Sequence, residues 1–68
     1  MRYRRIRDLR EDADLSQRQL AKELGMYKTT YANYERGERE IPLNVAIRLA
    51  KYYGVSLDYL AGLTNERK

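Results

Sequence analysis

The four glycines of this 68-residue chain limit its fold more than any other feature. They stand at positions 25, 37, 54 and 62, and each directly follows a segment with helical spacing of apolar residues. Glycine after the last helical residue adopts the left-handed conformation of a helix C-cap at little cost. The spacing therefore predicts short helices with tight connections and no linker.

The segment from residue 17 to residue 24 has the clearest helix start. Ser16 is followed three residues later by Gln19, which is the spacing of a capping box. In that motif the Ser16 hydroxyl accepts a hydrogen bond from the Gln19 main-chain amide, and the Gln19 side chain reaches back. The apolar side chains expected in the core are those of Leu20, Ala21 and Leu24.

Four further helices follow from the same kind of pattern. Helices are predicted over about residues 4–12 and 28–36, with Ile6 and Leu9 inward in the first and Tyr31 and Tyr34 inward in the other. A further helix begins near Pro42, because proline is well placed in a first helical turn. Its expected buried stripe, at i, i+3, i+4 and i+7, is Leu43, Ala46, Ile47 and Ala50, widened by Leu49 and Tyr53.

Ser56 is expected to cap a short fifth helix that contains Leu57 and Leu60, before a frayed tail over residues 64–68. No segment alternates with a period of two for long enough to predict a strand. The fold class is therefore all-α, as one domain of five helices over residues 1–68.

Length and composition exclude several classes of function. The chain has no cysteine and no histidine, so disulfides, thiolate or imidazole metal sites and histidine-dependent triads are impossible. No apolar run approaches the roughly 20 residues of a membrane-spanning helix, and the first residues lack the apolar stretch of a signal peptide. We expect a soluble cytoplasmic protein without catalytic residues, metal or cofactor, and without a membrane partner or small-molecule ligand.

Charge points to an anionic partner without identifying it. Fourteen Lys and Arg against ten Asp and Glu give a net charge of +4. Five arginines lie in the first ten residues: Arg2, Arg4, Arg5, Arg7 and Arg10. Such a cluster favours nucleic acid or anionic lipid, but an ordinary solvated helix face explains it equally well.

The spacing between residues 17 and 36 is more specific than the charge. Two helices joined by about three residues must cross closely at a steep angle. Ala21 supplies the small residue for the crossing, and Gly25 supplies the positive φ of the turn. The wedge between the helices is filled by Leu20, Leu24, Met26, Tyr31 and Tyr34. These features predict a helix-turn-helix.

The sequence resembles the phage repressor and Cro type of helix-turn-helix domain. The resemblance rests on residues 17–25, which read QRQLAKELG, and on residues 34–39, which read YERGER. Further matches extend it over about residues 4–60. It implies a sequence-specific transcriptional regulator of a bacterium or phage, with repression as the expected activity. The third helix would enter the major groove of double-stranded DNA.

Carried over by position, the resemblance implies base contacts from Lys28, Thr29 and Asn33, with Tyr27 just ahead of them. Their chemistry fits, since Lys28 can donate to guanine, Asn33 can pair with adenine, and the Thr29 methyl can contact a thymine methyl. Any one of them could instead be an ordinary polar residue of a solvated helix face.

The resemblance also implies phosphate contacts from Ser16 and Gln17, at the positive end of the second helix. Arg36 and Arg39 are further candidates, although Glu38 and Glu40 stand beside them. Arg10 and Glu35 match a structural ion pair of the resembling domains.

Two residues depart from the pattern of the family. Tyr27 starts the third helix, where Ser, Thr or Asp would cap better. Tyr31 replaces the usual Ile or Val, so its hydroxyl must find a partner or reach solvent.

We expect a homodimer, because one recognition helix reads too few base pairs to discriminate among competing sites. The predicted contact region includes Tyr59, Leu60 and Leu63. The alternative is a protein-interaction module such as an antitoxin, although only about six residues follow Gly62. An enzyme is disfavoured by the lack of histidine, cysteine and a metal cluster.

Overall fold

The structure is a computed structural model, and it describes residue 3 and residues 5–67. The regular elements of this part of the chain are all helices: α1 (Ile6–Asp12), α2 (Gln17–Leu24), α3 (Lys28–Arg36), α4 (Leu43–Tyr53) and α5 (Leu57–Ala61). The predicted all-α fold of five helices is confirmed. The first helix begins at Ile6, and Arg4, where the prediction began it, lies outside the described residues.

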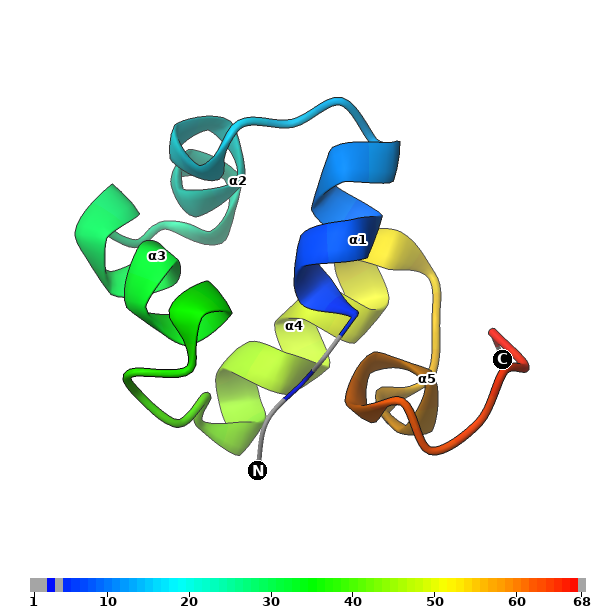
Figure 1. The fold of residues 1–68 in the computed structure, drawn as a ribbon. Helices are drawn as coiled ribbons and strands as arrows, with labels where there is room; N and C mark the ends of the chain where they lie inside the picture. The colour runs from blue at the N-terminus through cyan, green and yellow to red at the C-terminus, as the bar shows by residue number, and fades with distance from the viewer. Residues whose placement is uncertain (1–2, 4, 68) are drawn as a thin grey trace.

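The helices form two groups around α1 and α4 (Figure 1). α2 and α3 lie on one side of these two helices, and α5 lies on the other side. α2 packs chiefly against α3, and α4 packs chiefly against α5. One core joins them, made of Ile6, Leu9, Leu20, Ala21, Leu24, Tyr31, Ile41, Val45, Ala46, Leu49, Ala50 and Leu60. The helix-turn-helix is therefore held in place by the rest of the domain.

Both ends of α2 have the predicted chemistry. The Ser16 hydroxyl accepts from the Gln19 amide at 3.0 Å, and the Ser16 amide donates to Gln19 Oε1 at 2.8 Å. α2 ends at Gly25, whose φ of +70° is left-handed. A Cβ atom at this position would meet nothing within 4 Å, so the backbone conformation, and not lack of space, favours glycine here.

The predicted buried stripe of α4 is wrong at two positions. Leu43 is 62% exposed and Ile47 is 37% exposed, whereas Ala46 and Ala50 are buried as expected. The buried face is centred on Val45, Ala46, Leu49 and Ala50. α4 carries apolar residues around more than half of its circumference, so periodicity alone cannot tell which arc faces the core. Packing against the neighbouring helices decides it.

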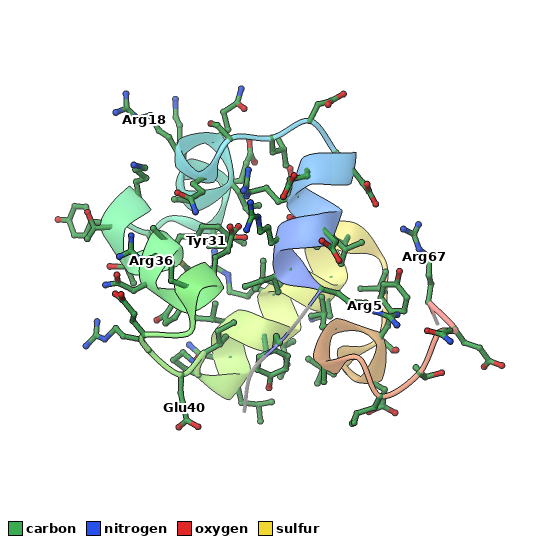
Figure 2. All side chains as sticks on the ribbon, viewed as in Figure 1. Arg5, Arg18, Tyr31, Arg36, Glu40 and Arg67 are labelled. Atoms are coloured by element: carbon green, nitrogen blue, oxygen red, sulfur yellow. The ribbon has the colours of Figure 1, made fainter. Side chains whose placement is uncertain are left out.

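The segment after α5, where a frayed tail is expected, makes contacts with the rest of the domain. Arg5 Nη1 donates to the carbonyl oxygen of Thr64 at 2.9 Å, and Nη2 donates to Asn65 Oδ1 at 2.7 Å. The Ser56 amide donates to the Arg67 carbonyl at 2.6 Å. The guanidinium groups of Arg5 and Arg67, both labelled in Figure 2, lie 4.1 and 5.6 Å from the centre of the Tyr59 ring. Lys68 lies outside the described residues.

The Tyr53 hydroxyl yields a first prediction, because it is buried without a hydrogen-bond partner. Burial raises the pKa of Tyr53 to about 12. Tyr53→Phe removes the unpaired hydroxyl and should raise the free energy of unfolding by about 0.5–1 kcal/mol. Urea denaturation followed by circular dichroism measures the change.

Tyr52→Phe is the matched control, because Tyr52 is 43% exposed and its ring keeps the same edge-to-face contact with Tyr53. It should change the free energy of unfolding by less than about 0.5 kcal/mol. A Tyr53→Phe protein less stable than Tyr52→Phe would contradict the prediction.

Candidate nucleic-acid interface

The start of α3 is exposed to solvent. Lys28 and Thr29 are exposed in its first turn. Tyr27 is the N-cap residue, makes no side-chain capping hydrogen bond and is 84% exposed. On the inner side of the helix Tyr31 is fully buried (Figure 2). One face of α3 is thus fixed in the core while three of the predicted base-contacting residues face solvent.

The fourth predicted base-contacting residue, Asn33, is held by a neighbour. Arg36 Nη2 donates to Asn33 Oδ1 at 2.6 Å and also lies 3.2 Å from Glu38 Oε2. The sequence predicts a base contact for Asn33 and a phosphate contact for Arg36, and the hydrogen bond between the two residues was not predicted. The signal was present, because residues at i and i+3 are neighbours on a helix surface.

The two predicted phosphate-contacting residues at the start of α2 make hydrogen bonds within the chain. The Gln17 side chain points to Glu35, and its Nε2 donates to Glu35 Oε1 at 3.1 Å. The Ser16 hydroxyl is used by the capping box. The Gln19 main-chain amide is used by Ser16 as well. The first main-chain amides of a helix have no partner within the helix, and such amides favour an anion. Arg39, in the loop after α3, is exposed.

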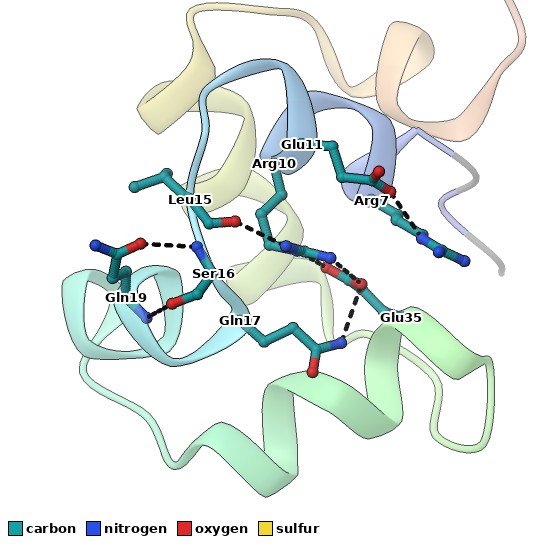
Figure 3. Close-up of polar contacts among 8 residues, drawn as sticks. All are labelled: Arg7, Arg10, Glu11, Leu15, Ser16, Gln17, Gln19 and Glu35. Atoms are coloured by element: carbon teal, nitrogen blue, oxygen red, sulfur yellow. Dashed lines mark hydrogen bonds and ion pairs between the residues drawn. The ribbon is translucent and has the colours of Figure 1, made fainter.

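Arg10 and Glu35 form an ion pair that ties α1 to α3 (Figure 3). Arg10 Nε lies 2.6 Å from Glu35 Oε2, and Nη2 donates to Oε1 at 3.2 Å, so the contact is bidentate. Arg10 Nη1 also donates to the Leu15 carbonyl at 2.7 Å. The two side chains are 13% and 3% exposed. With Gln17, the pair joins α1, α2 and α3 at the base of the helix-turn-helix.

The surroundings of Glu35 shift several pKa values. Burial by itself would raise the pKa of Glu35, but interactions with Arg10, Tyr31 and Gln17 outweigh it and lower that pKa. The hydrogen bond with Glu35 raises the pKa of Arg10, although burial opposes this. Burial, followed by the Glu35 carboxylate, raises the pKa of Tyr31. The Tyr31 hydroxyl has no hydrogen-bond partner of ordinary geometry, yet it lies near enough to the Glu35 carboxylate to lower the pKa of Glu35.

The arginines near the N-terminus do not form one basic patch in the described part of the chain. Arg5 contacts the C-terminal segment, Arg7 pairs with Glu11 at 2.8 Å, and Arg10 pairs with Glu35. Arg2 and Arg4 lie outside the described residues. An open cleft beside the start of α2 is lined by Arg7, Arg10, Gln17, Glu35, Arg36 and Glu38. Each arginine of this cleft has a glutamate partner, which offsets much of its charge.

Within residue 3 and residues 5–67, no group of three or more Asp and Glu side chains is placed to hold a metal ion. None of the helices described above is both long enough and apolar enough to cross a bilayer.

Comparison with known proteins fits this geometry. The sequence profile of the helix-turn-helix family matches residues 6–60, from the first residue of α1 to α5. The chain belongs to the helix-turn-helix family. The resemblance found in the sequence is therefore confirmed. No solved structure is significantly similar to this helix-turn-helix chain.

Several bacterial proteins are similar over most of the chain. YobD of Bacillus subtilis, named an uncharacterized HTH-type transcriptional regulator, is 39% identical over 97% of this chain and 59% of its own length. RstR of Vibrio cholerae, named a cryptic phage CTXphi transcriptional repressor, is 43% identical over 78% of this chain and 48% of its own. The control protein C.SmaI of Serratia marcescens is 38% identical over 91% of this chain and 77% of its own length. The chain thus spans about half the length of the first two relatives.

The Arg10–Glu35 pair generates a stability prediction. Arg10→Met would leave the nearly buried Glu35 carboxylate without its main partner, and should lower the free energy of unfolding by about 3–5 kcal/mol. Urea denaturation at neutral pH measures this loss. Arg7→Met is the control, because Arg7 forms an exposed pair with Glu11 that should contribute less than about 1 kcal/mol. Equal losses in the two variants would contradict the structural role of Arg10.

The lowered pKa of Glu35 predicts how stability depends on pH. A carboxyl group whose pKa is lower in the folded state stabilises the fold at pH above its ordinary value of about 4.3. This contribution is lost as pH falls through the lowered, folded-state pKa. The gap in unfolding free energy between wild type and Glu35→Gln should therefore narrow below about pH 4.3. A gap that stays constant from pH 7 to pH 3 would refute the prediction.

Proposed function

We propose that this chain is a sequence-specific DNA-binding transcriptional regulator that acts as a repressor. The exposed start of α3, on a helix whose other face is fixed in the core, carries the proposal. An α-helix presented in this way fits the major groove. Membership of the helix-turn-helix family and relatives named as regulators and repressors support it.

The residues divide into two roles in this proposal. Lys28 and Thr29 read base edges, and Tyr27 packs beside them against a base or the DNA backbone. The main-chain amides at the start of α2, next to Ser16 and Gln17, hold a phosphate. The Gln17 side chain donates a hydrogen bond to Glu35. Its main role in this proposal is therefore to orient the N-terminal end of α2, and contact with DNA is secondary.

The regulator acts as a homodimer in this proposal, because two recognition helices discriminate far better than one. The predicted contact region around Tyr59 and Leu60 does not fit the structure. Leu60 is fully buried in the core of its own chain, and two arginines cover the ring of Tyr59. Leu63, at 68% exposed, is the part of that region that a second copy could contact.

In vitro selection of bound DNA from a random pool tests the function directly. Two-fold-related half-sites should be enriched, with centres one helical turn apart, about 34–36 Å, or a multiple of it. A pool that shows no enriched sequence after repeated rounds would refute sequence-specific binding. Enrichment of a single half-site with a monomer bound would refute the dimer alone.

Two variants, Lys28→Met and Arg39→Met, separate base reading from phosphate contact. Lys28→Met should change which base is preferred at one position of the selected site. Arg39→Met removes the same charge from the loop after α3 and should weaken binding to all sequences equally. It should also lower the slope of log K against log salt by about 0.9 for the lost phosphate. Competition binding at several salt concentrations measures both effects. A Lys28→Met protein that loses the same affinity for every DNA sequence would contradict the base-reading role of Lys28.

A further inference from the structure

Asn33 and Arg36 lie one turn apart on α3, and their contact fixes the orientation of the Asn33 amide. A guanidinium group can only donate hydrogen bonds, so the atom that faces it must be the acceptor Oδ1. The distance of 2.6 Å from Arg36 Nη2 to Oδ1 is that of a short, charge-assisted hydrogen bond. The donor nitrogen Nδ2 is then on the other arm of the amide, turned away from Arg36.

Glu38 also contacts Arg36. The same nitrogen, Arg36 Nη2, lies 3.2 Å from Glu38 Oε2. Nη2 carries two hydrogens, and each of them has one of these two acceptors. The three residues therefore form one chain of contacts at the end of α3: Glu38, Arg36 and Asn33. Both charged side chains are more than half exposed, so the unit is at the surface of the protein.

This chain of contacts changes which base can form the better hydrogen bonds with the Asn33 amide. To pair with adenine, an asparagine must donate to N7 and accept from the N6 amino group through its oxygen. Here the oxygen already accepts from a cation, and an adenine amino group would have to share it with Arg36. Guanine presents two acceptors, N7 and O6, and no donor at this edge. The Nδ2 donor beside a guanidinium group matches guanine better.

We propose that Arg36 is a specificity-determining residue, which occupies Asn33 Oδ1 and thereby switches the base read by Asn33 from adenine to guanine. The inference rests on the proposed function, because it needs a DNA site to be read. It also replaces the phosphate contact that the sequence suggested for Arg36. Arg36 acts here as a positioning residue for Asn33.

The test measures base preference at one position of the selected site. That position is the one at which Asn33→Ala abolishes discrimination between bases. Wild type should bind guanine there about tenfold or more tightly than adenine, as one well-placed base contact allows. Arg36→Met should reduce this ratio to less than about threefold or reverse it toward adenine. Arg39→Met should leave the ratio unchanged, which controls for the loss of one positive charge.

Three outcomes in the same experiment would overturn the inference. Wild type could prefer adenine at that position. Asn33→Ala could leave discrimination intact at every position. Arg36→Met could weaken binding to all DNA sequences equally and lower the slope of log K against log salt, as Arg39→Met does. That result would make Arg36 a phosphate contact. Failure of wild type to select any sequence would instead refute the proposed function, and the inference with it.

A measurement without DNA tests the contact itself. Nuclear magnetic resonance relaxation of the Asn33 side-chain amide reports whether that group is held rigidly. The order parameter should be high in wild type, fall in Arg36→Met and stay high in Arg39→Met. An amide equally mobile in wild type and Arg36→Met would overturn the inference even if the protein binds DNA with high specificity.

Discussion

The bidentate contact between Arg10 and Glu35 is the interaction on which the geometry of the site depends. It joins α1 to α3, and the bond from Gln17 to the same carboxylate adds the start of α2. A buried pair of this kind requires both charges, because either one alone would lack compensation in a poorly solvated place. The pair therefore fixes the angle at which α2 and α3 stand relative to the rest of the domain.

The charges of the site follow from the same arrangement. Three described arginines that look like a basic cluster in the sequence have separate partners in the fold: the C-terminal segment for Arg5, Glu11 for Arg7 and Glu35 for Arg10. In the cleft beside α2, Arg36 likewise pairs with Glu38. In the proposed function, attraction of DNA then relies on oriented main-chain amides at the start of α2 and on exposed cations such as Lys28 and Arg39. Directional contacts of this kind favour a fixed register on DNA over general electrostatic attraction.

Local signals in the sequence predicted most of the fold. The capping box at Ser16 and the glycines after the helices each act within a few residues, so their effect does not depend on distant parts of the chain. The exposed face of α4 could not be predicted in this way. Leu43 and Ile47 have the same spacing as core residues, and only contacts with other helices exclude them from the core. The C-terminal segment depends on Arg5, which is almost sixty residues away.

For the candidate site, the sequence determined which residues stand at the start of α3 and that Arg10 and Glu35 could pair. Residue type and short-range spacing are sufficient for the start of α3. The pair of Arg10 and Glu35, which are 25 residues apart, was expected from the resemblance to the family. Only the tertiary structure decided which side chains of the site form hydrogen bonds with each other. Gln17 donates a hydrogen bond to Glu35, and Asn33 accepts one from Arg36. The reason is physical, because a hydrogen bond depends on distance and direction between particular atoms. Those are set when the helices pack, and the order of residues in the chain does not specify them.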